Sequence, residues 1–237
     1  MVKNDTLIKV AEGTTMNAYV VWSDQPPEKG IIVLQEAFGV NDYIRRMADR
    51  FAAQGFLAIA PELFHRTHPG FEADYEKREG VAEAMGAVTD EGLTVDMQAA
   101  YDWLLNELNP DGHGVSITVA VIGFCMGGRA AFLANTVLHI AASTSFYGGS
   151  IAPTLLDRAK DLHGPQLLVW GGADAHILPE HRRAVADALS AAGKPYVEAT
   201  FSEAGHGFAC DARSAYHAPF SREAFALVDA FFSDHLT

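Results

Sequence analysis

The chain has 237 residues, of which 49% are hydrophobic and 20% charged, and we predict one α/β domain over residues 1–237 because such domains often exceed 200 residues. A formal net charge of −13 argues against nucleic acid and anionic membranes as partners, since both repel an acidic protein. No apolar run approaches the roughly 18 residues of a membrane helix, no signal segment is evident and there are only two cysteines, so we expect a cytoplasmic monomer without membrane association.

The predicted elements alternate between strands and helices. Residues 7–11 and 17–22 indicate a hairpin, and the apolar residues 30–36 indicate a strand that is buried on both faces. A helix capped by Asn41 follows and ends at Gly55. We predict further strands at residues 56–60, 117–122, 141–146, 166–170 and 196–201, and helices at residues 71–87, 93–107, 129–135, 179–192 and 221–235. This alternation predicts a mostly parallel central sheet flanked by helices on both faces.

The segment Gly123-Phe-Cys-Met-Gly-Gly128 joins an apolar strand to a helix and has the form of a nucleophile elbow with cysteine as the nucleophile. Such a turn needs small neighbours, here Gly123 and Gly127, because the nucleophile is held at strained backbone angles. Cys125 also lies at a helix N-terminus, where backbone N–H groups favour a thiolate. The alternative is a buried, inert cysteine in a glycine-rich turn. The position between strand and helix favours catalysis and therefore a hydrolase.

A cysteine nucleophile needs a base and an acidic group that orients the base, and both follow later strands in this arrangement. Asp174 ends the apolar segment 167–174, so we expect its carboxylate at the carboxyl edge of the sheet. His206 lies between two glycines after the strand at residues 196–201. We predict a catalytic triad of Cys125, Asp174 and His206. The alternatives are a turn or capping role for Asp174 and an ordinary surface position for His206.

An oxyanion hole is the remaining part that this chemistry requires. We predict that it consists of the backbone N–H groups of Met126, directly after the nucleophile, and Ala37, after an earlier strand. Glu36 precedes Ala37 at the end of that strand. It is either a member of a structural salt bridge or a carboxylate close enough to Cys125 to influence the protonation of the thiol.

Four short motifs, Q-E-x-F-G, G-F-C-x-G-G, W-G-G-x-D and G-H-G-F, lie within about residues 30–210. Together they resemble the dienelactone hydrolase (carboxymethylenebutenolidase) family. The resemblance implies an α/β-hydrolase fold, a triad on Cys125, Asp174 and His206, and hydrolysis of an unsaturated lactone to an open-chain oxo acid. It also implies that Glu36 holds the resting cysteine until substrate binding displaces it.

The resemblance further implies that two arginines bind the carboxylate of the substrate. Arg78 corresponds to the first of them, and its alternative role is a surface ion pair with a neighbouring acidic residue. Cys210 stands where the second arginine is expected, and Gly207 stands where the family has a serine. Arg213 is a candidate to compensate for the missing arginine, although a solvated loop arginine is the commoner case.

We therefore expect hydrolysis of a small lactone or activated ester through a thioester on Cys125. Phe38 and Tyr147 are predicted as further substrate-binding residues. No metal or other cofactor is predicted, because the histidines and acidic residues form no ligand-spaced cluster and the glycines around Cys125 lack the lysine of a phosphate loop. Two alternatives stay open, a thioesterase or acyl transferase with the same triad, and a non-catalytic hydrolase-fold protein that binds a ligand.

Overall fold

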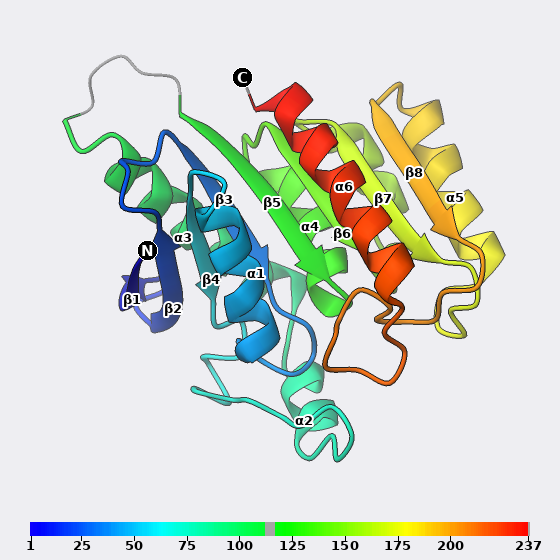
Figure 1. Ribbon diagram of the computed structural model, residues 1–237, viewed down its shortest axis with the longest axis horizontal. Coiled ribbons are helices and arrows are strands. Elements are labelled where there is room, and N and C mark those ends of the chain that lie inside the picture. Colours follow the sequence, from blue (N-terminus) through cyan, green and yellow to red (C-terminus); the bar gives the residue numbers. More distant parts are fainter. Residues whose placement is uncertain (112–116, 237) are drawn as a thin grey trace. The chain divides into compact units, whose positions relative to one another are not determined.

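The computed structural model describes residues 1–111 and 117–236 (Figure 1). The chain divides into two compact units, Met1–Ala120 and Val121–Thr237, and the single domain expected from the sequence stays a prediction. Over the described residues there are eight strands. Their order in the sheet is β1-β2-β4-β3 in the first unit and β5-β6-β7-β8 in the second.

The first unit begins with the predicted hairpin, which pairs β1 with β2 antiparallel. β2 is antiparallel to β4, whereas β3 and β4 are parallel and almost completely buried. Helix α1 lies on one face of these strands and α3 on the other (Figure 1), which explains why β3 and β4 are apolar throughout. The elements are β1 (Val2–Lys9), β2 (Thr15–Trp22), β3 (Lys29–Leu34), α1 (Asp42–Ala52), β4 (Phe56–Pro61), α2 (Val81–Gly86) and α3 (Asp90–Leu108).

Helix α1 begins and ends where the sequence predicts. The side chain of Asn41 accepts a hydrogen bond from the backbone N–H of Ile44 and so caps the helix. After the helix, Gly55 has a φ of +89°, a left-handed conformation that glycine adopts without steric cost. The local signals at both helix ends are therefore sufficient to place this element.

The helix expected over residues 71–87 is wrong for its first ten residues, since only Val81–Gly86 is helical. The carboxylate of Asp74 accepts hydrogen bonds from the backbone N–H groups of Glu76 and Lys77 at 2.9 and 3.0 Å, a turn that competes with a helix. Arg78 and Gly80 then adopt positive φ values of 56° and 72°. Residues 71–80, which precede α2, are called the 71–80 segment below.

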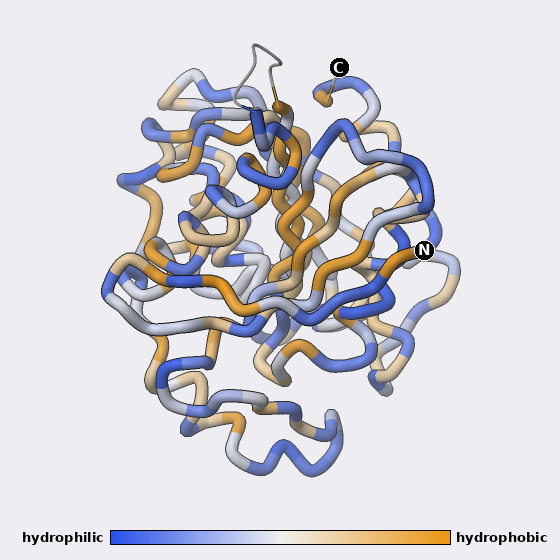
Figure 2. Tube along the Cα trace, turned by 90° about the vertical axis from the view of Figure 1, so that its left-hand side faces the viewer, coloured by the Kyte–Doolittle hydropathy of each residue, from blue (hydrophilic) through white to orange (hydrophobic). Residues whose placement is uncertain are grey.

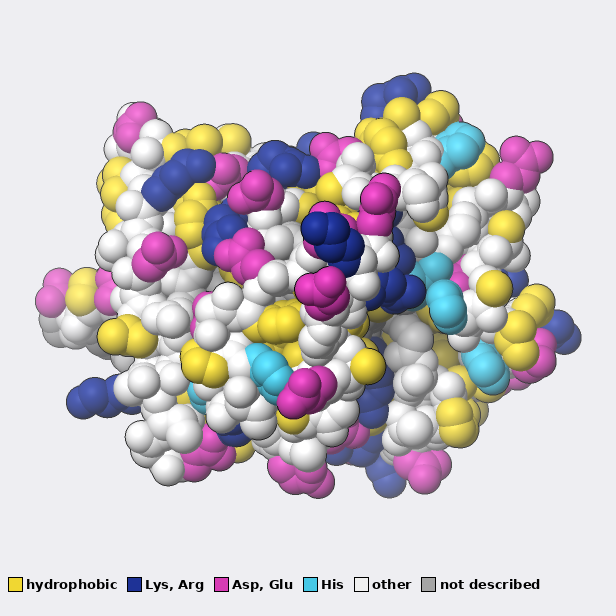
Figure 3. Space-filling model, turned by 90° about the horizontal axis from the view of Figure 1, so that it is seen from below, with side chains coloured by type: hydrophobic (Ala, Val, Ile, Leu, Met, Phe, Trp, Pro, Cys, Tyr) yellow, Lys and Arg dark blue, Asp and Glu magenta, His cyan; other side chains and the backbone are white. Residues whose placement is uncertain are grey.

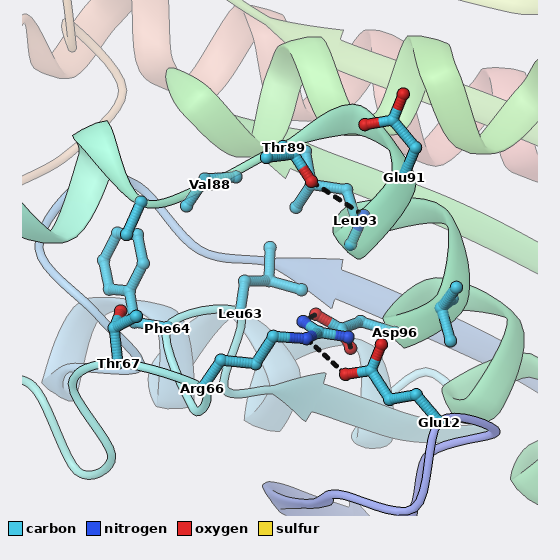
Figure 4. A pocket seen from close by; sticks show the side chains of 13 residues that line it. Glu12, Leu63, Phe64, Arg66, Thr67, Val88, Thr89, Glu91, Leu93 and Asp96 are labelled. Atoms are coloured by element: carbon cyan, nitrogen blue, oxygen red, sulfur yellow. Dashed lines mark hydrogen bonds and ion pairs between the residues drawn. The ribbon is translucent and has the colours of Figure 1, made fainter.

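An ion-pair network centred on the buried carboxylate of Asp96 ties the chain after β4 to α3. Arg66 donates two hydrogen bonds to the two carboxylate oxygens of Asp96, at 2.7 and 2.8 Å, and its Nε pairs with Glu12 of the β1–β2 turn (Figure 4). His65 contacts the same Asp96 carboxylate at 2.9 Å. Glu12, Arg66 and Asp96 border a cavity of about 310 Å³. Because two carboxylates already neutralise Arg66, we interpret the network as structural.

In the second unit β6, β7 and β8 are parallel. Helix α6 covers one face of β6 and β7, and α4 packs on the opposite face of β6 (Figure 1). The arrangement confirms the predicted mostly parallel sheet with helices on both faces. The elements are β5 (Thr118–Phe124), α4 (Met126–Val137), β6 (Ala142–Phe146), the 3₁₀ helix η1 (Leu156–Asp161), β7 (Gln166–Gly171), α5 (Pro179–Ala191), β8 (Tyr196–Phe201) and α6 (Ala218–His235).

Hydropathy follows the same architecture. Hydrophobic residues run along the strands, while the connecting loops are largely hydrophilic (Figure 2). On the face in Figure 3, basic side chains stand among acidic ones, so the net charge of −13 does not make this face uniformly acidic. None of the helices in the described part of the chain combines the length and the apolar character needed to cross a membrane.

Candidate active site

The predicted nucleophile lies between β5 and α4 in a strained conformation, because Cys125 has a φ of +56° and a ψ of −115°. This region of backbone space is unfavourable for a residue with a side chain and is found at functional sites. A Cβ atom on Gly123 would lie 1.8 Å from the carbonyl oxygen of Gly127, so only glycine fits there. The N–H of Cys125 donates to the carbonyl of Phe146 at 3.0 Å and so fixes the turn against the end of β6.

The three residues predicted as a triad form one hydrogen-bonded row within the second unit. The Sγ atom of Cys125 lies 3.1 Å from Nε2 of His206, and Nδ1 of His206 lies 2.7 Å from Oδ2 of Asp174. The other oxygen of Asp174 accepts the backbone N–H of His176 at 2.8 Å. The imidazole thus bridges the thiol and the carboxylate, the arrangement that a base needs to accept a proton from one side and be oriented from the other.

The electrostatics of the row favour a protonated imidazole. Burial by itself lowers the pKa of His206, but the hydrogen bonds with Asp174 and Cys125 and the charges of both groups outweigh burial and raise the pKa from 6.5 to about 9. Burial opposes ionisation of Asp174 as well. The hydrogen bond and charge of His206, followed by the N–H and charge of His176, nevertheless lower the pKa of the Asp174 carboxyl.

Two aromatic rings flank the imidazole of His206. The ring of Tyr147 is fully buried and lies 5.2 Å from that of His206, nearly edge-on. The exposed imidazole of His176 lies 5.1 Å from the His206 ring, and the planes of the two rings are 79° apart. The contact of His176 with the triad was not predicted, because its decisive group is a backbone N–H that no residue pattern reveals. Within residues 1–111 and 117–236, no three His, Cys, Asp or Glu side chains are grouped as metal ligands.

Arg213 lies beside the loop that carries His206. A Cβ atom on Gly207 would come within 2.6 to 2.7 Å of the Cζ, Nε and Nη1 atoms of Arg213, so the guanidinium occupies the space that a side chain at position 207 would need. Cys210 is fully buried. The two departures from the family pattern are thus related in space, because glycine at position 207 makes room for an arginine three residues after Cys210.

Met126, the first residue of α4, belongs to the second unit, whereas Glu36, Ala37, Phe38 and Arg78 belong to the first. Glu36 is fully buried, and its Oε2 accepts a hydrogen bond from the hydroxyl of Tyr75 at 2.8 Å. Ala37 and Phe38 are buried in a small cluster with Val81. Tyr75 was not predicted, because it lies 39 positions from Glu36 in a segment whose sequence favours a helix.

Arg78 lies in the turn at the end of the 71–80 segment rather than on the expected helix. It is exposed, and its guanidinium stands 5.6 Å from the centre of the Phe38 ring, within the range of a cation–π contact. The predicted role of Arg78 in binding a substrate carboxylate stays a prediction.

Comparison with known proteins assigns the chain to a family. The model of the "Dienelactone hydrolase family" matches residues 16–236. The chain belongs to the dienelactone hydrolase family. A predicted carboxymethylenebutenolidase of Yersinia pestis is 34% identical over 236 residues, which are 95% of this chain and 86% of the relative. The carboxymethylenebutenolidase of Pseudomonas putida is 27% identical over 213 residues, 88% of this chain and 87% of the relative.

The solved structures agree with this assignment. The crystal structure of a predicted dienelactone hydrolase from Klebsiella pneumoniae has a TM-score of 0.86 and 27% identity, over 98% of both chains. The predicted α/β-hydrolase fold and the predicted family are therefore confirmed. As a member of the dienelactone hydrolase family, the protein is a carboxylic ester hydrolase.

Proposed function

We propose that this dienelactone hydrolase family member cleaves a lactone or an activated carboxylic ester through a covalent thioester on Cys125. The observation that carries the proposal is the row Cys125, His206 and Asp174, with heavy-atom distances of 3.1 and 2.7 Å. In this proposal Cys125 is the nucleophile, His206 the general base and acid, and Asp174 the group that orients the imidazole and stabilises its protonated form.

Acylation begins when Nε2 of His206 takes the proton of the thiol. The Sγ atom of Cys125 then forms a bond to the carbonyl carbon of the substrate, and the carbonyl oxygen becomes an oxyanion. We assign its stabilisation to the backbone N–H groups of Met126, the first residue of α4, and of Ala37. When the oxyanion collapses, the carbon–oxygen bond to the leaving group breaks. The leaving oxygen takes the proton from His206, either as the bond breaks or directly after departure as an enolate, so the imidazole is neutral before deacylation begins.

Deacylation restores the enzyme. His206 removes a proton from a water molecule, whose oxygen attacks the carbonyl carbon of the thioester. The carbon–sulfur bond breaks, the carboxylic acid is released, and Cys125 leaves as a thiolate paired with the protonated imidazole. The raised pKa of His206, about 9, supports this pairing because it favours the imidazolium at neutral pH.

The nucleophile also limits the substrates. A thiolate is a better leaving group than an ordinary alkoxide, so the first tetrahedral intermediate returns to substrate unless the leaving group of the substrate is also good. An enol, a phenol or the enolate released by an unsaturated lactone meets this requirement. The chemistry thus favours activated esters and enol lactones over simple alkyl esters.

Arg213 supports a substrate that carries a negative charge. Its guanidinium lies against Gly207, the residue directly after His206, and a guanidinium binds carboxylates with paired hydrogen bonds. We propose that Arg213 supplies the charge that the family pattern places at position 210, and that Arg78 contributes from the first unit.

The proposal is tested by a substrate screen combined with trapping of the acyl enzyme. Dienelactones, p-nitrophenyl esters and acyl thioesters are assayed in parallel, and mass spectrometry of quenched enzyme locates the acyl group. We expect the highest kcat/KM for a carboxylate-bearing enol lactone and an acyl adduct on the peptide that contains Cys125. Turnover with the adduct on another residue, or none after peptide mapping under burst conditions, contradicts covalent catalysis by Cys125.

A further inference from the structure

Asp174 lies between β7 and α5, in residues 171–177, which we call the Asp174 loop. The backbone of this loop decides where the carboxylate of Asp174 points, and Oδ2 of that carboxylate lies 2.7 Å from Nδ1 of His206. One backbone bond within the loop is long, since the N–H of Asp174 donates to the carbonyl of Gly171 at 3.4 Å. A hydrogen bond of this length is weak, so it contributes little to the position of Asp174.

Part of the support for the Asp174 loop comes from the segment that precedes His206. The N–H of Gly172 donates to the carbonyl of Phe201 at 2.7 Å, and the N–H of Ala173 donates to the carbonyl of Ala204 at 2.9 Å. A Cβ atom on Gly172 would lie 2.4 Å from the carbonyl oxygen of Ser202, so the two backbones are in direct contact. These bonds hold the two residues just before Asp174.

Arg182, in the first turn of α5, contacts the Asp174 loop at both ends. Its Nη1 donates to the carbonyl of Gly171 at 2.8 Å and to the carbonyl of Ile177 at 3.4 Å. Because Nη1 carries two hydrogens, one cation joins the first and the last residue of the loop. The carbonyl of Gly171 also accepts the N–H of Asp174. Arg182 and Asp174 are therefore bound to the same backbone group.

The stability of α5 does not explain why an arginine occupies this position. A positive charge in the first turn of a helix opposes the macrodipole, whose positive end lies there. The bond to Gly171 is strong, however, because its donor is charged and the side chain of Arg182 is half-buried. We conclude that Arg182 stabilises the Asp174 loop rather than its own helix.

We propose that Arg182 is a positioning residue, which holds the Asp174 loop so that the carboxylate of Asp174 faces Nδ1 of His206. The proposal rests on the proposed function, in which Asp174 and His206 belong to a catalytic triad. When the guanidinium is removed, the carbonyl of Gly171 loses its charged donor, the loop relaxes, and the bond between Asp174 and His206 lengthens. The imidazole is then oriented less well and holds its proton less firmly, whereas substrate binding is unaffected.

The test compares Arg182→Met with Arg183→Met, which removes the same charge from the next residue of α5, an exposed arginine. The measurements are kcat and KM for a p-nitrophenyl ester, the pKa of His206 by NMR titration, and urea unfolding. In Arg182→Met we expect the pKa of His206 to fall by about one unit, a tenfold change in the proton equilibrium. We expect kcat to fall about 10- to 100-fold, the effect of a displaced catalytic group, and KM to stay within about twofold. Arg182→Lys keeps a charged donor and restores part of both values, and Arg183→Met matches the wild type.

A double variant separates positioning from stability. If Arg182 acts through Asp174, adding Arg182→Met to Asp174→Asn lowers kcat no further. A further loss of about tenfold in the double variant, or an Arg182→Met protein whose only change is a lower free energy of unfolding, refutes the positioning role while the triad stands. Arg182→Gln, which keeps a neutral donor, takes the place of Arg182→Met if that protein does not fold, and the same outcomes apply to it. If Asp174→Asn itself leaves kcat and the pKa of His206 unchanged, the triad is refuted and the role of Arg182 with it.

Discussion

Replacing Asp174 with asparagine tests the triad by a change of one group at nearly constant volume. In the wild type one oxygen of Asp174 accepts the N–H of His176 at 2.8 Å and the other meets Nδ1 of His206 at 2.7 Å. The oxygen of an asparagine is retained by the N–H of His176, which turns the NH₂ group toward Nδ1. Nδ1 then becomes an acceptor, the proton of the neutral imidazole moves to Nε2, and Nε2 loses the lone pair that accepts the thiol proton.

The magnitude follows from the pKa of His206. Its rise from 6.5 to about 9 corresponds to a preference of about 3 kcal/mol for the imidazolium, at about 1.4 kcal/mol per pKa unit. Asp174 provides a large part of this preference, so the pKa of His206 falls toward 6.5 in Asp174→Asn. We expect kcat to decrease by about 10³- to 10⁴-fold, the size of the effect when the orienting carboxylate of a triad is lost.

The stability of the protein provides an independent readout. A histidine whose pKa is raised in the folded state contributes stability that is fully present below pH 6.5 and is lost as the pH rises through about 9. The lowered pKa of Asp174 acts only in acid, since that contribution is present above pH 3.8 and is lost as the pH falls below it. Between pH 6.5 and 9 the free energy of unfolding therefore decreases in the wild type and changes less in Asp174→Asn.

The assay combines kcat for a p-nitrophenyl ester at pH 7 with urea unfolding at a series of pH values from 6 to 9.5. The NMR titration of the His206 ring gives its pKa directly. The reasoning is refuted if Asp174→Asn keeps kcat within tenfold of the wild type, or if both proteins lose stability equally between pH 6.5 and 9.

Substitutions at Cys125, Gly207 and Arg78 test the other parts of the site. Cys125→Ala abolishes turnover and leaves the fold intact, while Cys125→Ser keeps a trace of activity. Loss of a triad member lowers the rate by a factor of order 10⁴. A rate of more than about a tenth of the wild-type value in Cys125→Ala therefore contradicts a covalent mechanism. Gly207→Ala lowers the free energy of unfolding by more than about 1 kcal/mol, because an alanine there has an unfavourable φ of +81° and its Cβ clashes with Arg213. Adding Arg213→Ala to the Gly207→Ala protein removes the clash and recovers part of this free energy in urea unfolding. If nothing is recovered, the clash with Arg213 is not the cause of the loss. Arg78→Ala raises KM for carboxylate-bearing lactones by about 10- to 150-fold and leaves KM for neutral aryl esters unchanged. The factor corresponds to the loss of a charge-assisted pair of about 1.5 to 3 kcal/mol. If the variant and the wild type have the same kinetics on both substrate classes, Arg78 is a surface residue without a role in binding.

The elements that the sequence predicts correctly are those with strong local signals. The hairpin, the buried strands, the capped helix after Asn41 and the strand-to-helix junction at Cys125 each depend on neighbouring residues. Steric limits on the backbone and the period of the hydrophobic pattern decide such elements within one or two turns of chain. The order in which Asp174 and His206 follow the elbow also predicted which side chains meet, because parallel strands bring their carboxyl ends to one edge of the sheet.

The tertiary structure alone decided the rest. Residues 71–80 have the composition of a helix, but the side chain of Asp74 and the contacts of Tyr75 with Glu36 and Phe38 favour a turn, and packing outweighs the small helix propensities. The approach of Arg213 to Gly207 likewise depends on the path of a loop. By itself the sequence therefore determined the fold and which three side chains, those of Cys125, His206 and Asp174, lie in one hydrogen-bonded row. How the neighbouring groups orient these three depends on contacts between distant residues, which no local pattern encodes.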